Sequence, residues 1–262
     1  METKDFHRQY PPLSGSASGK TMNDLSLILR TVTANEPKAM AWTLSVAPDQ
    51  ARFAQMVFDH FATCLASVDK GQMFFQGIYV HARKMAGLSV LSALRQHRIE
   101  SGQNLRQVIE ATSQMGYHAM HPGTPDDLNQ PDMSVDEFMA ANEEGLKRAF
   151  RWIGTAYPPL SRDLKHNKDH INRHLSHATV LGSAFVFDYS ANTDTDRGFF
   201  DHPNEDETRM SLYLAGQVIM LAITMLGTAA RDAQGIKLQP GFGAAYDELI
   251  DVAMTVRQGF LA

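Results

Sequence analysis

The sequence has a single cysteine, Cys64, among its 262 residues, so no disulfide can form within the chain. Its first residues lack the basic-then-apolar pattern of a secretory leader, and we therefore expect a cytoplasmic protein. Basic charge is not in excess, because 24 Lys and Arg residues stand against 29 Asp and Glu residues, a formal net charge of −5. The chain therefore has no overall attraction for nucleic-acid phosphates or for an anionic membrane surface.

Several motifs that carry chemistry are absent or incomplete. The sequence has no Gly-x-Ser-x-Gly, Cys-x-x-Cys or His-Glu-x-x-His motif, which removes the common hydrolase and zinc-site patterns. It also lacks the two Glu-x-x-His motifs of a di-iron bundle. Residues 15–21 resemble a phosphate-binding loop with too few residues between its glycines, and residues 192–203 resemble a calcium loop with a displaced glycine. We expect both segments to be plain polar loops.

The apolar residues of the sequence show helical periodicity. Apolar residues recur every three or four positions, and a hydrophobic content of 44% is enough for a packed core. Strands do not alternate with helices, and no repeat of about 20 to 50 residues is visible. We predict an all-α fold, a bundle of six to eight mostly antiparallel helices. Residues 1–22 are expected to be a flexible N-terminal arm, and residues 23–262 a single helical-bundle domain.

Prolines and caps mark where the helices begin and end. Pro48 suits the first turn of a helix, Ser134 and Glu137 have capping-box spacing, and the Pro158–Pro159 pair interrupts a helical pattern. We expect helices over 25–32, 48–68, 73–96, 105–120, 134–157, 161–187, 210–230 and 246–260.

One helical segment is long and apolar enough to raise the question of a membrane. Residues 210–230 carry no formal charge, and that length could span a bilayer. The segment also contains Ser211, Gln217, Thr224 and Thr228, and the other expected helices have polar faces that need water. We therefore predict that it is the central helix of the bundle, buried on all sides, and that the protein has no membrane partner.

The first candidate site is a ladder of histidines within one expected helix, His166, His170, His174 and His177. At about 100° per residue these side chains form a stripe beside the apolar face. Two imidazoles four residues apart can bind one metal, but a tetrahedral site needs a further ligand from another helix, for which the candidates are His118, His121 and Glu110. A metal site, a polar acid–base site and an ordinary surface all remain open.

The second candidate site is a charged pair, Arg106 and Glu110, one helical turn apart. An exposed pair contributes only a few tenths of a kcal/mol, whereas a buried pair needs further polar partners because of its desolvation cost. Arg173, His174 and His177 have suitable chemistry for that role. Cys64 lies on an apolar stripe without an adjacent base, so we expect a small buried side chain and not a nucleophile.

At these residues the chain resembles a group of uncharacterised bacterial all-helical proteins, loosely similar to the HEPN class of small helical RNases. The resemblance runs from about Phe74 to Leu226 and rests on two short motifs, Leu105-Arg106-x-x-x-Glu110-Ala111 and Leu175-Ser176-His177-Ala178. It implies a bundle in which Arg106, Glu110 and His177 meet in one interior polar cluster. HEPN RNases use an Arg-x4-6-His pair; three residues separate Arg173 from His177, and the four-residue pair Arg197 and His202 lies in an acidic loop.

Three functions follow from these patterns, and whether the protein is an enzyme stays open. We favour a non-catalytic binding or scaffold protein in which the polar cluster fixes the helix packing. The alternative is a HEPN-like factor that acts on nucleotide or RNA phosphates, with candidate catalytic residues Arg106, Glu110, Arg173, His174 and His177. The second alternative is a metal-binding bundle that uses the histidine ladder. No cofactor is expected, and the candidate partners are a small molecule or nucleotide, another protein, or a second copy of the chain.

Overall fold

A computed structural model describes residues 27–122, 133–175, 200–201 and 203–260. The chain divides into two compact units, residues 1–37 and residues 38–262, and each is considered by itself. The arm expected at residues 1–22 lies outside the described residues. In the first unit the structure describes residues 27–37, the beginning of a helix that continues to Val46.

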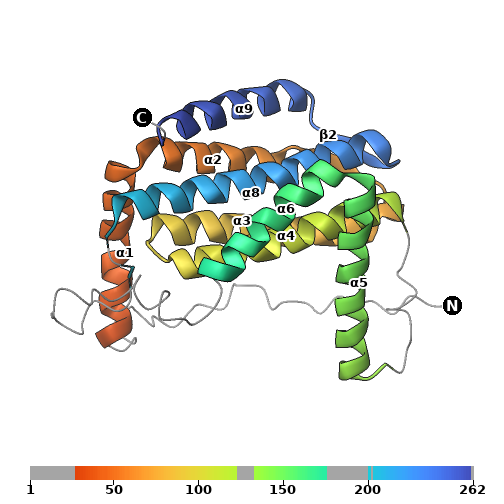
Figure 1. Cartoon of the computed structure of the whole chain (residues 1–262), viewed down its shortest axis with the longest axis horizontal. Coiled ribbons are helices and arrows are strands. Elements are labelled where there is room, and N and C mark those ends of the chain that lie inside the picture. The colour runs from red at the N-terminus through yellow and green to blue at the C-terminus, as the bar shows by residue number, and fades with distance from the viewer. Residues whose placement is uncertain (1–26, 123–132, 176–199, 202, 261–262) are drawn as a thin grey trace, which may run out of the picture. The chain divides into compact units, whose positions relative to one another are not determined.

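The described residues contain eight α-helices, two short strands and one 3-10 turn (Figure 1). The elements are α1 (Leu27–Val46), α2 (Pro48–Thr63), β1 (Leu65–Val68), η2 (Lys70–Gln72), α3 (Met73–Leu94), α4 (Arg98–Met120), α5 (Val135–Ala156), α6 (Pro158–His174), α8 (Glu205–Asp232), β2 (Ile236–Leu238) and α9 (Phe242–Gln258). The prediction of an all-α helical bundle is therefore confirmed.

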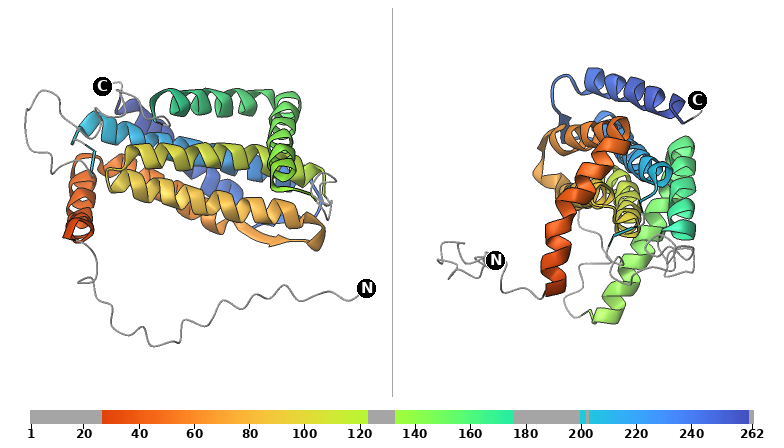
Figure 2. Two further views of the ribbon diagram at one scale, coloured as in Figure 1. Left: turned by 90° about the horizontal axis from the view of Figure 1, so that it is seen from below. Right: turned by 90° about the vertical axis from the view of Figure 1, so that its left-hand side faces the viewer.

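Helix α8 lies at the centre of the second unit. It packs against α2 and α4, while α3 and α4 form an antiparallel hairpin, as the two views of Figure 2 also show. Half of its residues are buried, among them Leu212, Ile219 and Ile223. By length and composition alone α8 could also cross a membrane, but most of its apolar stretch is buried against other helices. The prediction that it is buried on all sides is wrong on one side, where Met210 is 48% exposed.

The close approach of α8 to α2 depends on a glycine. A Cβ atom at Gly216 would lie 2.3 Å from a ring carbon of Phe53, whose side chain is fully buried. No side chain larger than hydrogen fits at that distance without a shift of the ring. The sequence therefore places its smallest residue where a fully buried phenylalanine ring of α2 meets the central helix.

Several helix ends lie where the sequence predicts them. Pro48 begins α2, Ser134 and Glu137 form a reciprocal capping box on α5, and Pro158 begins α6 immediately after the end of α5. The remaining boundaries differ: α1 runs to Val46, beyond the expected 25–32, α4 begins at Arg98, and α8 and α9 each begin about one turn earlier than expected. Helix α6 is described only as far as His174, so the expected continuation to 187 lies outside the described residues.

The predicted helix over 48–68 is wrong at its end. Helix α2 stops at Thr63, and Leu65–Val68 is a strand that pairs antiparallel with Ile236–Leu238. Leu65 and Val68 are three residues apart, which is the spacing of a helix face and not of one face of a regular strand. The strand has a register shift between Leu65 and Ser67. The pairing partner lies far along the chain, so a tertiary contact decides between the two conformations.

Two glycine substitutions test the close packing of α8. We expect Gly216→Ala to destabilise the fold by about 1–3 kcal/mol, because the clash with Phe53 exceeds the helix-propensity gain. Gly77→Ala is the matched control: this glycine is also within a helix, but a Cβ there meets nothing within 4 Å. We expect it to stabilise the fold by about 0.5–1 kcal/mol. Urea unfolding of both variants measures the change in the free energy of unfolding. A stabilised Gly216→Ala would contradict the packing described.

Candidate functional site

The predicted pair of Arg106 and Glu110 is present, and it has a third member. Arg106 Nε lies 3.2 Å from Glu110 Oε1, and Lys168 Nζ of α6 lies 2.9 Å from the same oxygen. The ammonium of Lys168 also lies 4.5 Å from the centre of the Phe150 ring. Glu110 thus joins α4 to α6, a role that sequence reasoning did not assign because Lys168 is distant in the chain.

The resemblance implies that Arg106 and Glu110 lie in the interior, but the structure leaves the pair partly exposed. The Arg106 side chain keeps 41% of its exposure and Glu110 keeps 23%. In the described residues Lys168, and not Arg173 or His174, is the residue that contacts Glu110 from α6. His177 lies outside the described residues, so its convergence on this cluster stays a prediction. One carboxylate here faces two cations. The cluster is therefore a partly exposed ionic contact between two helices.

Two of the ladder histidines face a common groove. His166 and His170 line it, and the His170 ring lies 4.8 Å from that of His174. The pKa of His170 is lowered from 6.5, first by partial loss of hydration and then by the nearby His174, His166 and Arg173. In the parts of the chain that the structure describes, no three His, Cys, Asp or Glu side chains are grouped to hold a metal. The metal alternative for the complete ladder stays a prediction.

The histidines suggested as further metal ligands lie in an aromatic cluster at the end of α4. His121 stacks on Tyr117 at 4.4 Å between ring centres, and His118 stacks on Phe74 at 5.9 Å. Trp152 of α5 meets His121 edge-on at 5.7 Å. Burial is the main cause of the lowered pKa of His118, so this ring is neutral near pH 7. Glu110 lies on α4 about two turns before His118.

A groove of about 600 Å³ lies on the surface of the second unit. Helix α8 forms its floor, α6 one wall and α9 the other, with Phe53 of α2 at its base; the right-hand view of Figure 2 shows α6 and α9 on either side of α8. The lining residues are Phe53, Asp163, His166, Asn167, His170, Met210, Tyr213, Leu214, Gln217, Met220, Leu221, Ile250, Ala253, Met254 and Arg257.

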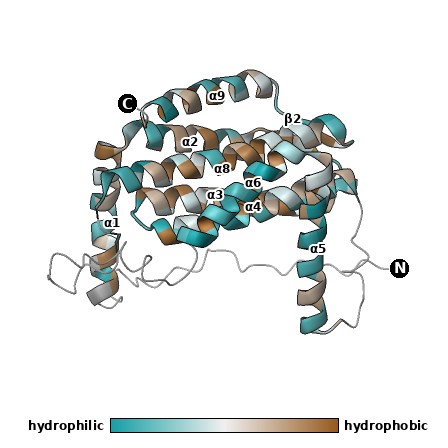
Figure 3. Cartoon of the chain, in the orientation of Figure 1, coloured by the Kyte–Doolittle hydropathy of each residue, from teal (hydrophilic) through white to brown (hydrophobic). Residues whose placement is uncertain are grey.

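Each helix contributes one regular stripe to this groove. Positions 163, 166, 167 and 170 of α6, positions 210, 213, 214 and 217 of α8, and positions 250, 253, 254 and 257 of α9 all have the spacing of a single helix face. The α6 wall is polar, while the floor and the α9 wall are mainly apolar and rich in methionine. Figure 3 shows the same contrast between hydrophilic α6 and the more apolar α8. Sequence reasoning did not find this groove, because residues 210–230 were expected to be buried on all sides.

A buried ionic cluster was also missed. The backbone N–H of Arg98 donates to Asp201 Oδ2, and Arg98 Nε donates to the same oxygen at 2.9 Å. Arg98 Nη1 also pairs with Glu207 of α8. Burial raises the pKa of Asp201, against the opposing effect of Arg98. This cluster holds the start of α4 next to the start of α8.

Asp201 also fixes the turn between α3 and α4. Its backbone N–H donates to the carbonyl of Gln96 at 2.9 Å, and Gln96 has a φ of 61°, a left-handed conformation that a non-glycine residue rarely adopts. Asp201 caps α4 from about a hundred residues away, which explains why the first turn of α4 gave no local sequence signal.

Cys64 is a buried side chain, as predicted. Its exposure is close to zero, and burial raises the pKa of its thiol to about 12. The thiolate, which is the nucleophilic form, is therefore almost absent at neutral pH.

Comparison of the chain with protein-family models, with curated proteins and with solved structures finds no match. The resemblance to HEPN-like helical proteins therefore stays a prediction.

The two ionic clusters differ in burial, and mutation should separate them. We expect Glu110→Gln to cost less than about 1 kcal/mol, because the pair is half-exposed and solvent screens it. Asp201→Asn should cost about 3 kcal/mol, because it leaves the buried Arg98 without its buried countercharge. Chemical unfolding at neutral pH provides both values. Equal costs, or a larger cost at Glu110, would show that the ranking by burial is wrong.

Three histidines with lowered pKa values should make the stability of the fold depend on pH. Burial is the first cause of the lowered pKa of His60, His118 and His170. Each is harder to protonate in the folded chain than in the unfolded chain. Their contribution to the free energy of unfolding is complete above pH 6.5. It is lost as the pH falls towards the lowered pKa values that these histidines have in the folded chain. We expect the free energy of unfolding to decrease between pH 7.5 and 5.5, and His118→Gln to reduce that slope. An unchanged slope in the variant would exclude the burial explanation.

Proposed function

We propose that the chain is a non-catalytic binding protein that holds the apolar face of an amphipathic helix in the groove between α6, α8 and α9. The observation that carries the proposal is the set of exposed apolar side chains around this groove, Met210, Ile250 and Met254. Contiguous apolar surface of this kind is uncommon on a protein that acts alone, and it marks binding surfaces.

The shape of the groove suits a helix. A partner helix recognised in a groove presents anchors at i, i+3, i+4 and i+7, and stripes with this spacing line all three sides here. The apolar floor and the α9 wall accept the apolar face of the partner, while the polar α6 wall borders its hydrated flank. Met210, Met220 and Met254 are unbranched and polarizable, so they can adjust to the side chains of the ligand.

The charged residues that the sequence singled out support a binding role more than a catalytic one. Glu110 is held by Arg106 and Lys168, and that contact joins two helices. An Arg committed to a carboxylate is less available to a phosphate group. This arrangement favours the scaffold reading of the Arg106–Glu110 pair over the nucleotide or RNA alternative.

A model peptide tests the proposal. The probe is a fluorescein-labelled helix of about 18 residues with leucines three and four apart and glutamates along one flank. We expect saturable binding in fluorescence anisotropy and a Kd at least about tenfold weaker for Met254→Glu, because a carboxylate would then be desolvated in the groove.

The control is Leu88→Glu, on α3 and outside the groove. Leu88 is 39% exposed and Met254 is 52% exposed, so both substitutions leave the core intact. Leu88→Glu should bind the peptide as the wild type does. Equal weakening by both variants would mean non-specific apolar contact, and binding of dodecanoate without binding of the peptide would assign the groove to a lipid-like ligand. Either result overturns the proposal.

A further inference from the structure

Helix α5 has an apolar face that is covered over only half of its length. In its second half Ala149 and Ile153 are buried against the bundle. In its first half the same stripe continues through Val135, Phe138 and Met139, whose exposed fractions are 77%, 49% and 59%. An amphipathic helix that exposes its apolar stripe needs a second surface to bury it.

The dimensions of this segment match those of the groove. The segment Val135–Leu146, slightly more than the first half of α5, and the stretch of α8 that forms the groove floor, Met210–Leu221, are both twelve residues long. Each is therefore about 18 Å in length. The segment could lie along the whole floor with its stripe of Val135, Phe138 and Met139 facing the apolar lining.

The charges of the two surfaces are also complementary. Val135–Leu146 contains four acidic residues and no basic residue. Helix α6, the polar wall of the groove, contains Arg162, Lys165, Lys168 and Arg173 against two aspartates. Its groove-facing residues are Asp163, His166, Asn167 and His170, so the excess of basic charge lies on the helix outside the lining. Opposite net charges on the two helices favour the encounter.

We propose that the occupant of the groove is the first half of α5 from a second copy of the chain. The inference rests on the proposed function, since it needs the groove to bind an amphipathic helix. The contact is head-to-tail: the donor contributes α5 and the acceptor contributes α6, α8 and α9. One such contact extends to larger assemblies, whereas a reciprocal exchange closes a dimer.

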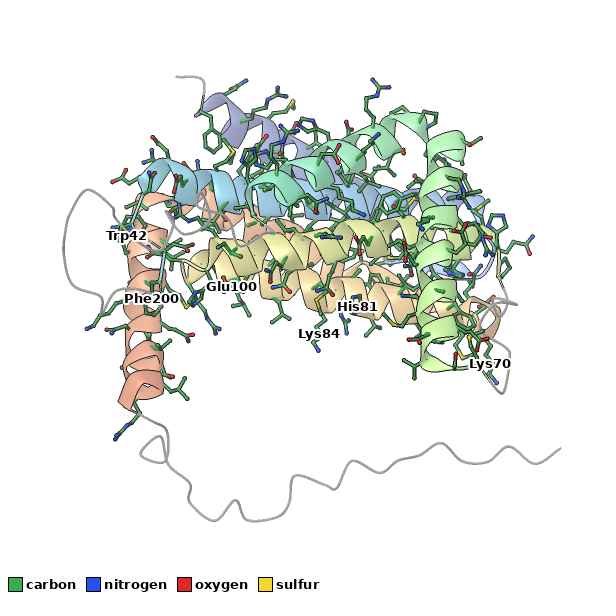
Figure 4. The ribbon with its side chains drawn as sticks, turned by 60° about the horizontal axis from the view of Figure 1, so that its bottom comes forward. Trp42, Lys70, His81, Lys84, Glu100 and Phe200 are labelled. Atoms are coloured by element: carbon green, nitrogen blue, oxygen red, sulfur yellow. The ribbon has the colours of Figure 1, made fainter. Side chains whose placement is uncertain are left out.

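A second apolar hollow, between α2 and α3, is the rival acceptor. It has a volume of about 390 Å³ and is lined by Phe58, Val80 and Leu88 beside Arg83 and Lys84. Figure 4 shows Lys84 directed away from the bundle on this side of α3. The hollow is smaller than the groove and has two helices around it in place of three. Mutation at Leu88 separates the two acceptors.

The first experiment measures the mass of the full chain by sedimentation velocity over a wide range of concentration. We expect reversible self-association, weakened about tenfold or more by Phe138→Glu in α5 and by Met254→Glu in the groove. Leu88→Glu should associate as the wild type does. Association that is lost in Leu88→Glu and kept in Met254→Glu would move the acceptor site to α3 and overturn the inference.

Mixing the two defective variants is the decisive step. Phe138→Glu keeps an intact groove and Met254→Glu keeps an intact α5, so a head-to-tail contact re-forms between them. We expect a heteromeric species in the mixture at concentrations where each variant alone is monomeric. If α5 instead pairs with α5 of another copy, Met254→Glu alone still associates through its intact α5, and the inference fails. A mixture that stays monomeric also overturns the inference.

Failure of this inference can be distinguished from failure of the proposed function. One outcome is a monomeric wild type that still binds the model peptide, while Met254→Glu loses that binding. This result overturns α5 as the occupant and leaves the groove as a helix-binding site. Absence of peptide binding at concentrations where the chain is monomeric overturns both. If the inference is correct, the model peptide dissociates the assembled chain, because the two compete for one groove.

Discussion

The packing of α8 against α2 and α4 is the interaction on which the rest of the structure depends. It buries half of the residues of α8, and it requires hydrogen in place of a side chain at Gly216, where Phe53 comes within contact distance. Burial of apolar surface is the dominant favourable contribution to folding, so the longest apolar helix takes the central position. Because α8 is central, other helices cover most of its surface. The part that stays open is the side between α6 and α9, and that side can form a binding surface.

The groove follows from that arrangement. Helix α6 is too polar to cover the apolar surface of α8 completely, and α9 packs mainly on α2. Met210, Leu221 and Met254 are therefore left around an open channel and not in a closed core. The charged clusters have another role: Arg98 with Asp201, and Glu110 with Lys168, join helix ends and helix faces around the core.

The sequence predicted the features that depend on local chemistry. The helical period identified the all-α class, and Pro48, Pro158 and the Ser134 capping box located helix starts, because these signals act within one or two turns. It failed where the partner is remote: the strand at Leu65–Val68 needs β2, and the first turn of α4 needs Asp201. For the site, the Arg106–Glu110 contact was predictable from spacing, whereas Lys168 and the groove depend on which helices meet.

The most direct test of the central claim, that the α6–α8–α9 groove is the binding surface, is a methyl NMR titration of the chain labelled at its methionine methyl groups with the unlabelled model helix. The signals of Met210, Met220 and Met254, which line the groove, should shift together and saturate at one peptide per chain. Those of Met115 and Met225, fully buried in the core, should stay in place. Shifts confined to methionines outside the groove, or no saturable shift at all, would contradict the account.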